Sequence, residues 1–280
     1  MRRPAGRWPL LAAVLGAASS GLLLSIGAFE TPEVVPEGWL RTARWAGLLA
    51  LLSALAASVA TDLDDYAIPD VLTLPLAAAQ IAAAAALAQT QIAHLYTDWT
   101  DPMAALVGPT IPAWISARPH LHGLAWSAAG AATGFAVVMA IRWTASLALG
   151  RPALGSGDAT LMLLAGSFLG WQPTLVAIGV APLLCVIGIP ASKLATGRSF
   201  VAFGPYLAAA TLIVLCAWRR LWLGSDPSQV EGGLRIVFSD PALAAIAVGA
   251  VIGGTAMLLG LLRALRSVPV RGRGAGDDGE

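Results

Sequence analysis

Residues 47–88 have the sequence GLLALLSALAASVATDLDDYAIPDVLTLPLAAAQIAAAAALA, in which two apolar runs flank a short acidic loop. Each run approaches the roughly 20 residues that an α-helix needs to cross the hydrocarbon core of a bilayer. A helix satisfies its own backbone hydrogen bonds in lipid, and these runs are too long for the strands of a membrane barrel. The stretch therefore predicts two membrane-spanning helices joined by a loop that holds several carboxylates.

The composition of the whole chain extends this prediction. Of its 280 residues, 57% are hydrophobic and 12% are charged, whereas a soluble domain has about 25% charged residues. We expect an all-α fold, a polytopic integral membrane helical bundle of about eight transmembrane helices. The predicted spans are 8–29, 41–61, 71–91, 123–147, a short 159–171, 174–192, 200–218 and 241–262.

The two ends of the chain have distinct compositions. Three arginines precede the apolar run at 8–29, which permits a cleaved signal peptide. We favour a retained first span, because the run is longer than a typical signal core. Residues 267–280 are rich in Gly, Arg and Asp and are predicted to form a disordered tail. The two cysteines, Cys185 and Cys216, lie in apolar runs, where we expect buried thiols rather than a disulfide framework.

The distribution of basic residues predicts the orientation of the bundle. With the amino terminus in the cytoplasm, eleven of the 17 Lys and Arg residues lie on the cytoplasmic side and six on the outer side. This bias agrees with the tendency of Lys and Arg to remain inside. Loops 62–70 and 148–158 then both face the cytoplasm.

Asp62 and Asp158 lie in these two loops, each at the end of an apolar helix. A carboxylate at membrane depth is costly and usually faces a polar cavity, although acids of this kind also occur as solvated residues of interfacial loops. Asp158 is a predicted N-cap, where the helix dipole favours its ionised form. Asp62 closes span 41–61, where the dipole disfavours it. We hypothesise that the two acids divide general-acid and general-base work.

The residues around these acids have competing interpretations. Asp64 and Asp65 are predicted to be solvated, and Asp70, which follows a proline, is predicted to cap the helix at 71–91. Gly155 and Gly157 leave the backbone open to an extended substrate, or simply form a turn. Phe203-Gly204-Pro205 is predicted to interrupt a helix, so that the freed backbone binds substrate or the helix is merely kinked.

Three sequence blocks together resemble one family, the type IV prepilin peptidases, which are membrane aspartyl proteases of the GxGD type. Residues 61–75, TDLDDYAIPDVLTLP, are similar to that family's Asp-containing loop and the stretch after it. GSGD at 155–158 and LLAGSFLGW at 163–171 resemble its GxGD loop and following helix, and FGPYLA at 203–208 resembles a third helix. The blocks occur in the family's order and bracket roughly residues 45–215.

The resemblance implies an aspartic endopeptidase of the bacterial inner membrane. It would cleave leader peptides on the cytoplasmic side, from prepilin or pseudopilin precursors with a basic leader and an apolar helix. Asp62 and Asp158 would be the catalytic pair that activates water, with no metal, no cofactor and no nucleic-acid partner. The predicted substrate-binding or structural residues are Gly155, Gly157, Phe203, Gly204 and Pro205.

The same resemblance suggests how the chain is divided. A catalytic membrane domain at 41–222, with an outer insert at 92–122, would follow an N-terminal span and outer loop at 1–40. A C-terminal span at 223–266 and the tail at 267–280 would complete the chain.

The sequence departs from the family pattern in three places. Thr160 stands where many members have Lys. The insert contains Trp99, Trp114, His94, His120 and His122, and we expect an amphipathic interfacial loop there rather than a metal site. The paired Cys-x-x-Cys insert of bifunctional members is missing, so we do not expect N-methyltransferase activity.

Two other functions are compatible with the sequence. Intramembrane acids also relay protons in transporters, and a homologue without activity could act as an assembly scaffold. A protease loses precursor processing when either aspartate is neutralised, whereas a transporter leaves precursors uncut.

Overall fold

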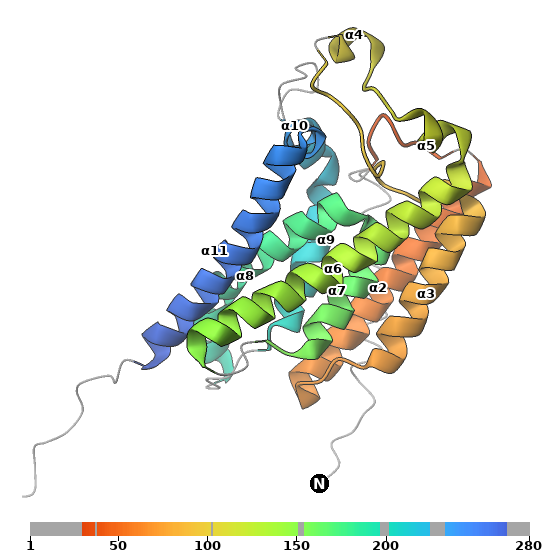
Figure 1. The fold of residues 1–280 in the computed structure, drawn as a ribbon. Coiled ribbons are helices and arrows are strands. Elements are labelled where there is room, and N and C mark those ends of the chain that lie inside the picture. The colour runs from red at the N-terminus through yellow and green to blue at the C-terminus, as the bar shows by residue number, and fades with distance from the viewer. Residues whose placement is uncertain are drawn as a thin grey trace, which may run out of the picture.

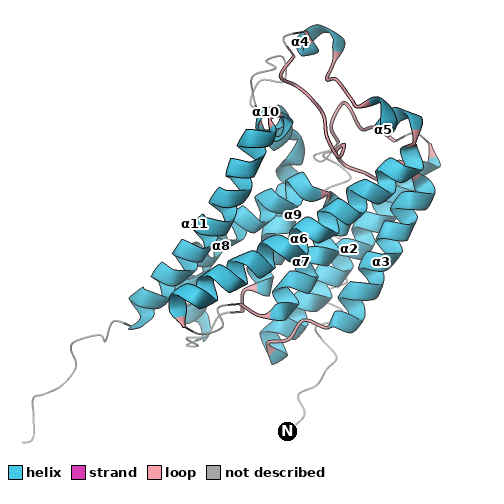
Figure 2. Cartoon of the chain, in the orientation of Figure 1, coloured by secondary structure: helices cyan, strands magenta, loops and turns pink. Residues whose placement is uncertain are grey.

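The chain folds into helices joined by loops, as shown in Figure 2. The computed structural model describes residues 30–36, 38–101, 103–150, 154–196, 202–224 and 233–267. The helices are α2 (Trp39–Asp65), α3 (Asp70–Leu87), α4 (Ala104–Val107), α5 (Ala113–Ala117), α6 (Pro119–Leu149), α7 (Ser156–Leu169), α8 (Trp171–Thr196), α9 (Gly204–Leu223), α10 (Leu234–Ser239) and α11 (Pro241–Ser267). Within the described ranges, the one extended pairing is an isolated bridge between Asp98 and Thr110. The predicted all-α class is confirmed.

Six described helices, α2, α3, α6, α8, α9 and α11, are long and apolar enough to cross a membrane. They correspond to six of the predicted spans, and the predicted short span corresponds to α7, which has 14 residues. The chain is therefore a polytopic membrane bundle. The predicted span 8–29 and the predicted tail beyond residue 267 lie outside the described residues.

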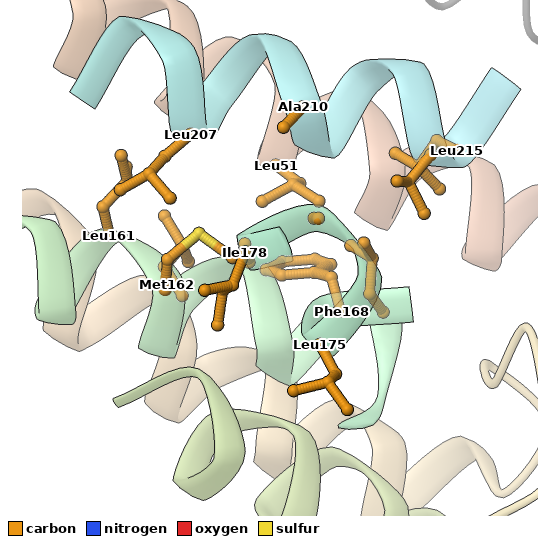
Figure 3. Close-up of a cluster of buried hydrophobic side chains, with 14 of the residues drawn as sticks. Leu51, Leu161, Met162, Phe168, Leu175, Ile178, Leu207, Ala210 and Leu215 are labelled. Atoms are coloured by element: carbon orange, nitrogen blue, oxygen red, sulfur yellow. The ribbon is translucent and has the colours of Figure 1, made fainter. Parts of the chain in front are cut away.

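The short helix α7 lies at the centre of the bundle, in contact with α2, α3, α6, α8 and α9. Leu161 of α7 points toward Leu207 of α9, and Met162 and Phe168 lie in the same buried cluster as Ile178 and Leu175 of α8 (Figure 3). A helix that is apolar on all sides is stable when other helices cover it. Because its neighbours enclose it, α7 does not have to present a lipid-facing side.

Glycines bring α6 and α7 unusually close together. A Cβ atom added at Gly130 of α6 would collide with the carbonyl oxygen of Gly166 of α7, and one added at Gly166 would collide with the carbonyl oxygen of Gly130. Ser127 Oγ also donates a hydrogen bond of 2.7 Å to the carbonyl oxygen of Ser167. Small residues allow this approach, since helices in lipid associate largely by close packing.

The segment between α3 and α6, which contains α4 and α5, forms a cap over one end of the bundle together with α10 (Figure 1). Tyr96 Oη donates to the carbonyl oxygen of Ser239 at 2.9 Å, and Trp171 Nε1 donates to that of Leu95 at 2.8 Å. One bond thus runs from an insert side chain to the backbone of α10, and the other from a side chain of α8 to the backbone of the insert. The loops that lead into α3 and α7 lie at the opposite end of the bundle (Figure 1).

Candidate active site

A cavity of about 360 Å³ opens at the end of the bundle opposite the cap. Its walls come from the last turn of α2, the connection from α2 to α3, the entry to α7, and the residues before α9. The cavity contains both predicted catalytic acids, Asp62 and Asp158, which lie 96 positions apart in the sequence. The other lining residues are Tyr66, Ala67, Ile68, Asp70, Leu154, Gly155, Ser156, Gly157, Ala202 and Phe203.

Asp62 lies in the last turn of α2, because this helix continues to Asp65 and does not end at residue 61. Tyr66 then ends the helix in the left-handed conformation, with φ of 53°. The Asp62 side chain is buried, and its Oδ2 accepts a hydrogen bond of 3.1 Å from the backbone N–H of Gly204. A backbone donor on α9 thus fixes the orientation of this carboxylate.

The motif Phe203-Gly204-Pro205 begins α9, so the predicted helix interruption is wrong. Phe203 is the N-cap residue, and Pro205 lies in the first turn, where its missing N–H costs no hydrogen bond. A Cβ atom at Gly204 would overlap the Asp62 carboxylate. Gly204 therefore lets the amino end of α9 reach Asp62.

The hydrogen bond from Gly204 to Asp62 also removes the basis for predicting that Asp62 resists ionisation more than Asp158 does. Asp62 is close to the C-terminus of its own helix, which disfavours a negative charge. Its carboxylate, however, receives an N–H from the first residue of α9, where the helix dipole favours a negative charge. The helix ends alone therefore do not make Asp62 the acid that resists ionisation.

Asp158 is the third residue of α7, and Gly155 is the N-cap, so the predicted capping position of Asp158 is wrong. Its Oδ2 reaches back and accepts a hydrogen bond of 3.1 Å from the Gly155 backbone N–H. An acid in the first turn often satisfies a free N–H in this way. The Asp158 side chain is buried, and the first turn of α7 holds it at the cavity wall.

Gly157 explains how the two acidic segments approach each other. A Cβ atom at this position would lie 2.9 Å from Cβ of Ile68, in the connection from α2 to α3. A larger residue would push the two walls of the cavity apart. The described contacts thus give Gly155, Gly157 and Gly204 structural roles in the site.

Carboxylates are the charged groups in the lining of the cavity, and Arg142 of α6 also interacts electrostatically with Asp158. Asp62 and Asp158 interact electrostatically, and Asp70 is a third acid in the lining. No Lys or Arg is among the described residues that line the cavity. Like charges in one site disfavour simultaneous ionisation, so this arrangement suits a pair of acids that shares a proton.

The remaining acids of the loop differ from one another. Asp64 and Asp65 are exposed, as predicted, although both belong to the last turn of α2. Asp70 does not cap α3, because Pro69 is the N-cap and makes no side-chain capping bond. Instead, Asp70 Oδ1 accepts a hydrogen bond of 2.7 Å from Thr160 Oγ1. The sequence contains no local pattern that signals this contact.

His94 lies in the cap, and His120 and His122 lie at the start of α6, away from the cavity. The His94 and His122 rings are 5.3 Å apart between centroids, and His120 Nδ1 lies 2.9 Å from the carbonyl oxygen of Ala85. Burial lowers the pKa of His94 below its ordinary value. The described part of the chain contains no group of three or more His, Cys, Asp or Glu side chains arranged to hold a metal ion.

Comparison with curated proteins identifies several similar sequences, all named prepilin leader peptidase/N-methyltransferase. The protein from Aeromonas salmonicida is 29% identical over 179 residues, which cover 62% of this chain and 50% of that protein. The Dickeya chrysanthemi protein is 30% identical over 195 residues, or 63% of this chain and 56% of its own length. The Burkholderia pseudomallei protein is 28% identical over 217 residues, or 74% of this chain and 54% of its own length.

The chain spans about half the length of the curated relatives that it matches. No family model matches the sequence, and no solved structure matches it. The curated similarities support the family resemblance that the three sequence blocks indicate.

Proposed function

We propose that this chain, which is similar to curated prepilin leader peptidases, is a type IV prepilin peptidase, a membrane aspartic endopeptidase that removes leader peptides from prepilin-like precursors. The observation on which the proposal depends is the meeting of Asp62 and Asp158 in one cavity. Three separate parts of the chain build this cavity, and they contain the same three blocks that resemble the family.

Asp62 and Asp158 perform the proposed chemistry as a pair. One carboxylate, in its ionised form, accepts a proton from a water molecule as that water attacks the scissile carbonyl carbon. The other, in its protonated form, donates a hydrogen bond to the carbonyl oxygen. When the intermediate collapses, the C–N bond breaks and the leaving amine takes a proton from the pair. The backbone N–H groups of Gly204 and Gly155 hold one oxygen of each acid in place.

The carboxylates can share this proton because they face the same cavity. Two interacting negative charges in one cavity repel, so one acid retains its proton under conditions in which an isolated carboxyl group would lose it. We assign the roles to the pair and not to one residue each, since both acids are buried and each accepts one backbone N–H. The proposed reaction requires neither a metal ion nor a cofactor.

The proposed substrate and membrane side follow from charge. The basic-residue bias favours an orientation in which the cavity opens to the cytoplasm of a bacterial inner membrane. A precursor with a basic leader would bring positive charge to a cavity lined by three acids and no basic side chain among its described residues. Its apolar helix could remain in the lipid while the cleavage site enters the cavity.

Purified protein in lipid vesicles, incubated with a prepilin-like precursor, tests the proposal. The expected result is a shorter product whose new amino terminus follows the basic leader, as identified by mass spectrometry. A proton-relaying transporter would instead leave the precursor uncut and acidify the vesicle interior or its surroundings. An intact precursor after prolonged incubation with correctly folded protein would contradict the proposed function.

A further inference from the structure

One hydrogen bond between residues other than Asp62 and Asp158 connects the segments that hold these two acids. Thr160 Oγ1 in α7 donates to Oδ1 of Asp70, the first residue of α3, over 2.7 Å and across 90 positions of sequence. The Thr160 side chain is buried, and Asp70 belongs to the lining of the cavity. The hydrogen bond thus connects the segment that follows Asp62 to α7, the helix that holds Asp158.

The positions of the two residues relate the bond to the catalytic acids. Thr160 follows Asp158 by two residues in the first turns of α7. Asp70 follows Asp62 after a short connection that turns sharply at Tyr66 and contacts Gly157 through Ile68. A bond between Thr160 and Asp70 therefore restrains the connection against the helix that holds Asp158.

We infer that Asp70 and Thr160 form a positioning pair, which sets the separation of the Asp62 and Asp158 segments in the proposed protease. This inference rests on the proposed function and adds two residues that do not touch the reacting atoms. It also gives Thr160 a role at the position where many family members have Lys. A hydroxyl group links the two segments here without placing a positive charge beside the catalytic acids.

The chemistry of the bond determines which substitutions preserve it. An O–H donor on a carboxylate forms a short, charge-assisted hydrogen bond, and Thr160 also lies 3.0 Å from the carbonyl oxygen of Gly157 in its own helix. Thr160→Ser retains the hydroxyl group, whereas Thr160→Val retains the branched shape and loses the donor. Asp70→Asn retains an oxygen acceptor, whereas Asp70→Leu removes it.

Steady-state cleavage of a prepilin-like precursor, with kcat and KM determined separately, tests the pair. We expect Thr160→Val to lower kcat about tenfold or more with little change in KM, because small displacements of catalytic groups reduce turnover strongly. Asp70→Leu should lower kcat to a similar extent and should also raise KM, because it removes one of the three acids that line the cavity. The double variant should be no slower than either single variant, since both remove the same bond. Thr160→Ser and Asp70→Asn should recover most of the lost kcat.

Thr211→Val is the matched control. The Thr211 hydroxyl group is also buried and donates to a carbonyl oxygen, that of Leu207, but within α9. This variant should retain the kcat of the unaltered protein. Thermal unfolding in detergent should show all the variants folded at the assay temperature.

The outcomes separate the positioning pair from the proposed function. If the unaltered protein cleaves the precursor and Thr160→Val keeps full kcat, the pair does not position the acids. Independent, additive losses in the double variant would also overturn the inference, as would unfolding of both apolar variants, which would show a purely structural bond. Failure of the unaltered protein to cleave would instead contradict the proposed function.

Discussion

Replacement of Gly204 by alanine perturbs the candidate site at a single, well-defined contact. The added methyl group would overlap Oδ2 of Asp62 and lie 3.2 Å from both Cγ of Asp62 and Cδ1 of Ile68. Neither neighbour is free to move far, because Asp62 is buried and Ile68 packs against Gly157. The carboxylate must therefore rotate or move away from the amino end of α9.

The size of the effect follows from the bond that this movement breaks. The Gly204 N–H donates to a carboxylate over 3.1 Å, and a hydrogen bond to a charged group contributes about 1.5–3 kcal/mol. If this contribution is lost in the transition state, kcat should fall roughly 10- to 160-fold at 1.36 kcal/mol per factor of ten. Displacement of Asp62 from its reactive position would add to this loss.

Gly249→Ala and Gly253→Ala in α11 provide the matched controls. Nothing lies within 4 Å of a Cβ atom built at either position, and alanine is a better helix former than glycine by about 0.5–1 kcal/mol. Initial rates of precursor cleavage should be measured for all three variants at equal amounts of folded protein. Normal turnover by Gly204→Ala, at normal abundance in the membrane, would refute the assigned role of this contact.

Three further predictions concern the fold and the limits of the activity. Arg44→Met should destabilise the protein by about 3–5 kcal/mol, because it breaks a buried ion pair with Glu30 at 3.1 Å. Arg41→Met removes an exposed arginine that pairs with the same glutamate and should cost about 0–1 kcal/mol. Equal losses of unfolding free energy for the two variants in chemical unfolding would contradict this difference. Gly166→Ala should lower stability by about 1–3 kcal/mol or more through overpacking, since its methyl group meets the backbone of α6, and an unchanged unfolding midpoint would show that α6 and α7 separate easily. If the proposed function holds, a mature substrate from cells in which this protein is the one prepilin peptidase should have an unmethylated amino terminus, because the chain has two cysteines and both lie in apolar helices. An added mass of one methyl group would show that methylation does not need the cysteine-rich insert.

The long helices could be predicted from the sequence because lipid imposes a length and an apolar composition on each span. The runs that contain α2, α3, α6, α8, α9 and α11 meet both conditions independently of their partners. The identity of the central helix α7 was also predictable from its apolar composition. Its burial on all sides was not, because this depends on the five helices that surround it.

The details of the site depend on contacts between distant segments, which local patterns do not contain. Asp70 follows a proline and has the local features of a helix cap, yet a hydroxyl group 90 positions away is its observed partner. Gly204-Pro205 has the features of a helix break, and these two residues also suit the first turn of a helix. In both cases, the local preference permits two structures, and tertiary packing selects one of them.

The kinetics of Asp62→Asn, Asp158→Asn and the double variant test the central proposal most directly. Each change preserves size and much of the hydrogen bonding but removes the ability to ionise. We expect either single change to abolish most precursor cleavage and the double change to be little worse, since groups that act as a unit are not additive. Asp64→Asn, at an exposed acid of the same loop, should cleave normally. Wild-type cleavage by either Asp62→Asn or Asp158→Asn, in folded protein, would contradict the assignment of these two residues as the catalytic pair.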